Sequence, residues 1–155
     1  MDNYHGPLQS EFSWHCYGCG KCNESGLQAE TIKTKEGYLC RWEAVEEHVA
    51  HPGKYHHGLI TTICFCHGAW SATAENYERD GNVITDPLEY FYVNRKISYE
   101  VHKPIPLNSI ALIYAKVRLG DDATAEVNFE VLVDEVVCAT ATTDLVKVYA
   151  TVMEF

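Results

Sequence analysis

Residues 58–77 read Gly-Leu-Ile-Thr-Thr-Ile-Cys-Phe-Cys-His-Gly-Ala-Trp-Ser-Ala-Thr-Ala-Glu-Asn-Tyr, and this stretch decides the fold. It is apolar on almost every side and about five helical turns long. A helix this apolar belongs in the interior of a protein. The β-branched Ile and Thr residues lower helix propensity, so a buried strand is the competing interpretation. The length and the Ala-rich second half favour a buried helix.

The segments on both sides of this helix are typical of strands. Before it, the pattern predicts strands over 27–34 and 38–44, joined by a turn at 36–37. After it, strands are expected over 90–102, 109–119, 123–133 and 136–150. Tight turns at 120–122 and 134–135 would join the last three strands. The order predicts an α+β fold in which a five- to six-stranded antiparallel sheet packs on one long central helix.

The size and charge of the chain exclude several function classes. A chain of 155 residues suits one domain, 1–155, which buries roughly 70% of its unfolded surface. Twelve Lys and Arg residues against 22 Asp and Glu give a net charge of −10, which argues against nucleic acid or an anionic membrane as partner. The longest apolar runs fall far short of the roughly 20 residues that span a bilayer.

The N-terminal segment, residues 1–27, is rich in His, Cys, Gly and aromatic residues. We expect a loop or short helical turn that packs on the rest of the domain. The start of the chain lacks a basic segment followed by an apolar one, so no secretory signal is expected. Seven cysteines, an odd number, then indicate reduced thiols and a cytoplasmic protein.

Three stretches, in register with the expected elements, are similar to motifs of one known family. The first is Cys16-Tyr-Gly-Cys-Gly with Asn23 and Gly26-Leu27. The second is His-Pro-Gly-Lys-Tyr-His-His-Gly-Leu-Ile over 51–60, and the third is Val-Asn-Arg-Lys-Ile-Ser-Tyr-Glu-Val-His-Lys-Pro-Ile-Pro over 93–106. Together they resemble the PaaI-like branch of the hotdog-fold thioesterase superfamily.

This resemblance implies a hotdog fold, in which the sheet wraps the central helix. It also implies a homodimer, with a tetramer left open, whose two sheets join edge to edge around a ligand tunnel at the subunit interface. The implied ligand is an acyl-CoA thioester. Coenzyme A would be part of the substrate, and no separate cofactor is expected.

The resemblance also assigns catalytic positions. The motif His of the family corresponds to His56, and the two glycines that follow it correspond to His57 and Gly58. In the family the N–H after the motif His polarises the thioester carbonyl, a role that would fall to His57. Its imidazole replaces a glycine hydrogen and would crowd the approaching thioester.

The largest departure from the family pattern is Phe65, which stands nine residues after His56, where the family has an Asp or Glu. Phe neither accepts a proton nor attacks a carbonyl. The first hypothesis is therefore a thioesterase-like enzyme with a displaced catalytic group. The alternative is a non-catalytic protein that binds or senses acyl-CoA or an acyl chain. A hotdog dehydratase is a third class, whose signature is not visible here.

Several neighbours are candidates to support the site. At 100° per residue, Thr61 and Thr62 lie on the same helix face as Gly58 and Phe65 and offer hydroxyls that bind substrate or orient water. Gly68, Ala69 and Ala72 share that face. Asn94 replaces the Thr or Ser of many relatives on the strand that faces the site, and we count it among the catalytic candidates.

Other polar residues have a functional and a structural interpretation. Cys66 offers a nucleophile and His67 a base, but a buried thiol and a core or interface histidine are the commoner roles. His48 and His51, before the helix, offer a base at the tunnel mouth, but we interpret them as loop histidines.

Four basic residues are candidates to meet the phosphates of CoA: Lys54, Arg95, Lys96 and Lys103. Each also fits a solvated surface charge. The run His15-Cys-x-x-Cys19-x-x-Cys22 has the spacing of zinc ligands, but lacks the separated second pair that most structural zinc sites use. Cys16 and Cys19 belong to the family signature, so we interpret them as packing cysteines and expect no metal.

Overall fold

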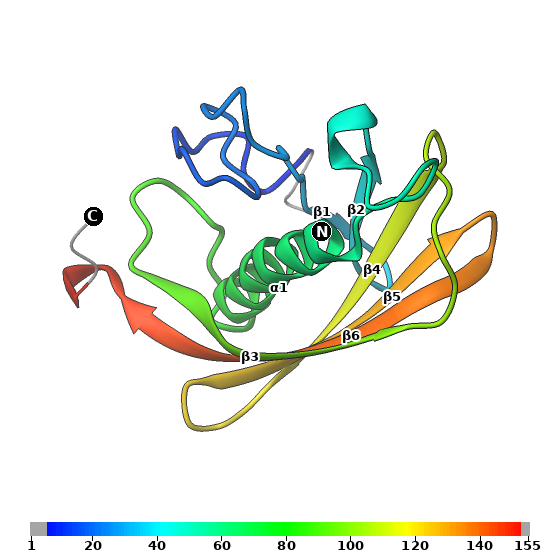
Figure 1. Ribbon diagram of the computed structural model, residues 1–155. Helices are drawn as coiled ribbons and strands as arrows, with labels where there is room; N and C mark the ends of the chain where they lie inside the picture. Colours follow the sequence, from blue (N-terminus) through cyan, green and yellow to red (C-terminus); the bar gives the residue numbers. More distant parts are fainter. Residues whose placement is uncertain (1–5, 153–155) are drawn as a thin grey trace.

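One long helix lies in the hollow of a curled, six-stranded antiparallel sheet (Figure 1). The computed structural model describes residues 6–152; residues 1–5 and 153–155 of the expected domain lie outside the described residues. The elements are β1 (Ile32–Thr34), β2 (Gly37–Glu43), η1 (Glu46–His48), α1 (His57–Arg79), β3 (Tyr90–Val101), β4 (Ile110–Leu119), β5 (Thr124–Val133), β6 (Val136–Tyr149) and η2 (Ala150–Val152). The sheet order β1-β2-β4-β5-β6-β3 makes β1 and β3 its edges. The expected hotdog architecture is confirmed.

The helix α1 is buried, as its sequence predicts, and extends the predicted range by one residue at its start and two at its end. Ile60, Ile63 and Cys64 are fully buried against the sheet. The face that carries Gly58, Thr61, Thr62 and Phe65 remains partly exposed. This face is the stripe that the helical spacing predicts, and it runs along the first half of the helix.

The second half of the helix is covered, so the predicted stripe does not continue there. Ala69 and Ala72 are buried, and a Cβ on Gly68 would lie 2.9 Å from the ring of Phe129, so Gly68 faces the sheet. An aromatic cluster packs over this half: Phe12 and Trp14 from the N-terminal segment, Trp70 from α1 and Phe91 from β3, with ring centroids 4.9–5.7 Å apart. The N-terminal segment therefore packs on the helix, as predicted.

The predicted strand over 27–34 is wrong for its first five residues, because only Ile32–Thr34 form β1. Gln28 has a φ of 50°, which interrupts an extended chain. The N–H groups of Leu27 and Ala29 bond the carbonyls of Tyr17 and Gly18. These residues pair with the N-terminal segment instead of extending the sheet.

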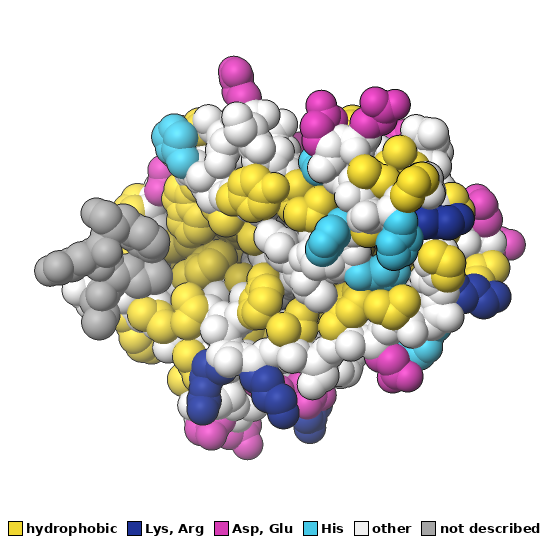
Figure 2. Space-filling model, viewed as in Figure 1, with side chains coloured by type: hydrophobic (Ala, Val, Ile, Leu, Met, Phe, Trp, Pro, Cys, Tyr) yellow, Lys and Arg dark blue, Asp and Glu magenta, His cyan; other side chains and the backbone are white. Residues whose placement is uncertain are grey.

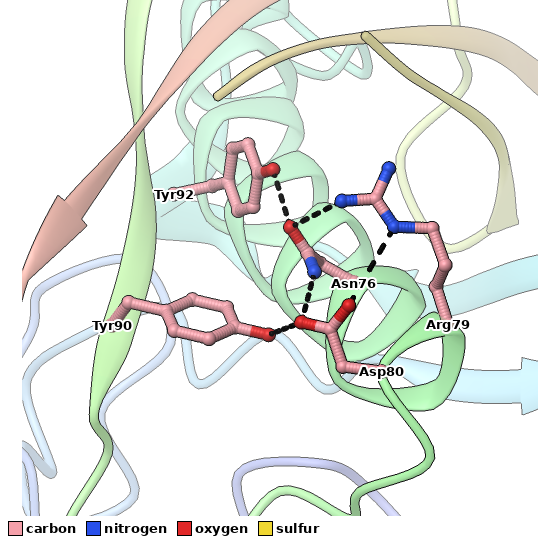
Figure 3. A network of polar contacts seen from close by, with 5 residues as sticks. All are labelled: Asn76, Arg79, Asp80, Tyr90 and Tyr92. Carbon is pink, nitrogen blue, oxygen red and sulfur yellow. Dashed lines mark hydrogen bonds and ion pairs between the residues drawn. The ribbon is translucent and has the colours of Figure 1, made fainter. Parts of the chain in front are cut away.

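A polar network fixes the far end of α1 to β3 (Figure 3). The Tyr92 hydroxyl donates to Asn76 Oδ1 at 2.7 Å, and Asn76 Nδ2 donates to Asp80 Oδ2 at 2.8 Å. The Tyr90 hydroxyl also donates to this carboxylate oxygen, at 3.2 Å, and Arg79 bonds both Asn76 and Asp80. Because Asn76 is fully buried, its amide is held in one orientation. The network sets the register between the helix and the edge strand along which the candidate site lies.

Candidate functional site

The first turn of α1 is capped by a histidine. The N–H of Gly58 donates a 3.0 Å hydrogen bond to Nδ1 of His56, which is the N-cap residue. A Cβ at Gly58 would lie 2.7 Å from the His56 ring, so glycine is what allows the ring to fold over the helix start. Within residues 6–152 no acceptor meets the N–H of His57, the first helical residue. This N–H is free to meet a ligand at the positive end of the helix dipole.

The side chain of His57 turns toward β3. Its Nδ1 and the Tyr99 hydroxyl are 2.7 Å apart, and its Nε2 is buried without a hydrogen-bond partner. Burial lowers the pKa of His57, partly opposed by the nearby carbonyl of Lys103. The imidazole is therefore neutral near pH 7 and has one ring nitrogen left for a ligand or a partner group.

The two threonines of the stripe are bonded within the helix. Thr61 and Thr62 donate their hydroxyl protons to the carbonyl of Gly58, at 2.6 and 3.1 Å. A Cβ on Gly18 would lie 3.5 Å from the Thr62 methyl group, so the N-terminal segment packs beside it. Each hydroxyl retains only its acceptor lone pairs for a water or a substrate.

Two turns along the helix, Phe65 and Asn94 are joined. Asn94 Nδ2 donates a 2.9 Å hydrogen bond to the carbonyl of Phe65, while Asn94 Oδ1 is buried without a partner among the described residues. The Phe65 ring is half-buried on the exposed stripe. The structure thus brings together the two positions that the resemblance places beside the thioester. It leaves an unsatisfied acceptor next to them.

Two of the remaining histidine candidates, His67 and His48, have structural roles. His67 is fully buried; its Nδ1 lies 2.9 Å from the Thr31 hydroxyl and its Nε2 lies 3.1 Å from the Ile113 carbonyl. Burial lowers the pKa of His67 to about 3, so this ring is a neutral core group, as its helical position predicts. His48 accepts a hydrogen bond from the Val45 N–H and packs on Trp42, and His51 is exposed.

The cysteine candidates are brought together in an unexpected combination. The sulfur atoms of Cys16, Cys19 and Cys66 all lie within 4.8 Å of one another, and Cys22 is not among them. Hydrogen bonds from the Cys19 and Cys66 thiols hold the pKa of Cys16 well below its usual value. The bond to Cys16 raises the pKa of Cys19 to about 11, partly opposed by the bond from Cys66, and bonds to Cys16 and Cys19 raise the pKa of Cys66 still further. Together the three thiols lose a first proton easily and a second one with difficulty. Cys66 therefore keeps its proton and is not available as a thiolate nucleophile.

The basic candidates separate into two groups. Arg95 and Lys96 are exposed and line a depression beside Arg118 and the loop after β4, and Arg95 lies within an irregularity of β3 between Asn94 and Lys96. Lys54 and Lys103 instead lie near the helix start. Lys54 is two residues before the N-cap, and the Lys103 carbonyl is close to the His57 ring.

Figure 2 shows an apolar hollow on the face where the N-terminal segment and β3 come together. Partly buried apolar side chains of these elements and of α1, among them Trp14, Cys66 and Phe91, pack against the core. Histidine side chains gather on the same face (Figure 2). No helix within residues 6–152 has the length and apolar character needed to cross a bilayer.

Sequence reasoning identified most of these positions but missed Tyr99 as the partner of His57. The alternation of Ile97, Tyr99 and Val101 predicts a half-buried strand, but only the tertiary register places the phenol at the helix start.

No family model and no curated protein sequence matches the chain. Solved structures do match. The Streptococcus mutans protein smu.793, bound to acetyl-CoA, has a TM-score of 0.63 at 17% identity over 78% of this chain and 89% of that one. A thioesterase superfamily protein from Shewanella loihica has 0.60 at 20% identity, covering 86% and 93%. A hypothetical thioesterase with coenzyme A from Streptococcus pneumoniae has 0.60 at 16%, covering 78% and 86%. At these identities the likeness establishes the fold.

Proposed function

We propose that the chain is a hotdog protein of the thioesterase superfamily, similar to the PaaI-like branch, that binds acyl-CoA thioesters along α1 and β3. Hydrolysis is slow or absent because Phe65 occupies the position of the water-activating carboxylate. The observation that carries this proposal is the free N–H of His57 at the start of the helix. It lies at one end of the exposed stripe, which continues to Phe65.

The chemistry of this stripe suits a thioester carbonyl. A backbone N–H at a helix N-terminus combines a directed donor with the helix dipole, and both stabilise negative charge on an oxygen. His57 Nε2 and Asn94 Oδ1 are buried polar atoms without partners in the described chain. Such atoms are rare in native proteins, and a ligand or a second subunit that meets them removes the cost of leaving them unpaired.

The surroundings of the stripe suit the two ends of an acyl-CoA. The apolar hollow of Figure 2 is suited to an acyl chain. Lys54 and Lys103 near the helix start are candidates to meet phosphates. Arg95 and Lys96 would contribute from another direction, because they line the depression beside Arg118. The three similar structures described above are of thioesterase proteins or of proteins that hold CoA or acetyl-CoA, which supports this ligand class for the chain.

The site is proposed to be completed by a second copy of the chain. Among the strands of residues 6–152, β3 has β6 as its only neighbour, so its other edge presents backbone groups over twelve residues. Pairing of two such edges would form a homodimer with one continuous sheet and close the exposed stripe into a tunnel. All seven cysteines are free, which agrees with the cytoplasmic location that we propose.

A non-catalytic role is the second candidate, and Phe65 is the observation that favours it. Within the described chain no carboxylate bonds the polar atoms of the stripe, and His67 lies in the core. A protein that binds acyl-CoA without consuming it would act as a sensor or carrier.

The test is a panel of acyl-CoAs with increasing chain length, with binding measured by calorimetry and hydrolysis by chromatography. We expect binding of at least one thioester and little free CoA product. The Asn94→Leu variant should weaken binding at least about tenfold, because it removes both the amide N–H and the unpaired amide oxygen beside Phe65. The matched control is Ser98→Ala, an exposed position on the same strand, which should bind like the wild type. Absence of binding across the panel would refute the proposal.

A further inference from the structure

Three cysteine sulfurs from two distant parts of the chain meet at one point. Cys16 and Cys19 come from the N-terminal segment, and Cys66 comes from α1, 50 residues away from Cys16. The Cys16 and Cys66 sulfurs are 3.7 Å apart, and all three sulfurs lie within 4.8 Å of one another. The linear run from His15 to Cys22 therefore does not assemble as a unit, and Cys66 joins Cys16 and Cys19 as the third member of the group.

This spacing is close to that of thiolates around a metal ion. Sulfurs bound tetrahedrally to zinc at about 2.3 Å lie about 3.8 Å apart. The Cys16–Cys66 distance already matches, and the other two distances need to contract by at most about 1 Å, which small side-chain rotations of the cysteines supply. The sequence lacked a separated ligand to complete the Cys-x-x-Cys pair, and the fold provides one.

The groups around the sulfurs are arranged to support thiolates. The indole Nε1–H of Trp70 donates to the Cys19 sulfur at 3.3 Å. Donors of this kind orient metal-bound thiolates and stabilise their charge.

Gly18 lets the loop approach the helix. A Cβ at this position would lie 2.4 Å from the Cys66 sulfur, so any other residue would displace this sulfur or push the loop away from α1. The close approach of the Cys-x-x-Cys loop to Cys66 is therefore a specific property of this sequence.

We propose that Cys16, Cys19 and Cys66 form a site for one zinc ion, with a fourth position open to solvent on the side of Cys16. On binding, each sulfur that still carries a proton loses it to solvent, an S–Zn bond forms, and no atom changes its redox state. The ion ties the N-terminal segment to α1 beside Phe65. This proposal does not depend on the proposed function, because it concerns the cysteines alone.

The experiment uses the full chain, reduced with a non-thiol reductant and freed of metal by a chelator, then titrated with Co²⁺. We expect one equivalent to bind, with a thiolate-to-cobalt charge-transfer band of the intensity of three thiolates and visible bands of tetrahedral cobalt. Zn²⁺ should displace it and raise the melting temperature. Cys66→Ser should remove one thiolate from the band and weaken Co²⁺ binding at least about tenfold.

Two controls separate this site from the alternatives. Cys22→Ser tests the linear run and should leave the spectrum unchanged, as should Cys138→Ser, a buried cysteine on β6. If Cys66→Ser does not fold, Cys16→Ser, at an exposed position, provides the same comparison. A wild-type protein without the charge-transfer band, or a band lost in Cys22→Ser and kept in Cys66→Ser, would overturn the proposal. Neither result depends on acyl-CoA binding.

Discussion

The side-chain amide of Asn94 donates a 2.9 Å hydrogen bond to the backbone carbonyl of Phe65. It joins the edge strand of the sheet to the helix at the residue where the resemblance leads one to expect a carboxylate. The bond is one of several hydrogen bonds between α1 and β3: His57–Tyr99 lies toward the start of the helix, and bonds of Tyr92 to Thr73 and Asn76 lie toward its end. The site is thus a line of polar contacts between two elements, and its geometry depends on how firmly they are joined.

The Asn94→Ala variant should lower the free energy of unfolding by about 1 kcal/mol, because it removes this hydrogen bond from a half-buried position. The loss is limited because Asn94 Oδ1, which has no partner, is removed as well. Urea unfolding measures the change, and Ser98→Ala provides the exposed control on the same strand. Equal stability of the two variants would show that the Asn94 amide does not hold the helix.

The His56 cap of α1 predicts that Gly58→Ala changes stability in opposite directions with and without the His56 side chain. Gly58→Ala should destabilise the wild type by up to about 1 kcal/mol, because the new Cβ displaces the His56 ring and the cap is lost. In a His56→Ala background the same change should stabilise the protein by about 0.5 to 1 kcal/mol, since Ala favours a helix over Gly. Thermal or urea unfolding of the four proteins gives the coupling. Additive effects would mean that the ring does not cap the helix.

The lowered pKa of the buried His67 ring predicts how the free energy of unfolding changes in acid. Its folded-state pKa of about 3 lies below the unfolded value near 6.5, so between these values the unfolded chain binds the extra proton. The free energy of unfolding should fall as the pH drops from 6.5 to 3, with His67 contributing up to about 1.4 kcal/mol per pH unit. His67→Gln should flatten this dependence, whereas His51→Gln, at an exposed position, should not. Parallel profiles for wild type and His67→Gln would contradict the assignment.

The fold was largely predictable because its signals are local. The apolar stretch over 58–77 becomes α1, and the four strands after it end within one residue of their predicted bounds. The predicted turn at 134–135 forms with positive φ at both Asp134 and Glu135, as a two-residue hairpin requires. These features depend on residues close in the chain, which is what periodicity and turn composition report.

The site was predictable only in part, because its contacts join segments distant in the chain. Helical spacing placed Phe65 on the open stripe and His67 in the core. No local pattern indicates that Cys66 meets Cys16 or that Tyr99 meets His57, since both depend on how the N-terminal segment and β3 lie on the helix. The failure over 27–31 has the same origin, because backbone bonds to Tyr17 and Gly18 override the strand propensity there.

The central claim is that the chain retains the binding half of a thioesterase site and lacks the group that activates water. It is tested most directly by the initial rate of acyl-CoA hydrolysis, compared between the wild type and Phe65→Asp, with Phe65→Asn as the matched control without a carboxylate. We predict slow or undetectable turnover by the wild type and by Phe65→Asn, and a rate at least about tenfold higher for Phe65→Asp. Rapid hydrolysis by the wild type, or no gain in a folded Phe65→Asp variant that still binds the thioester, would contradict this account.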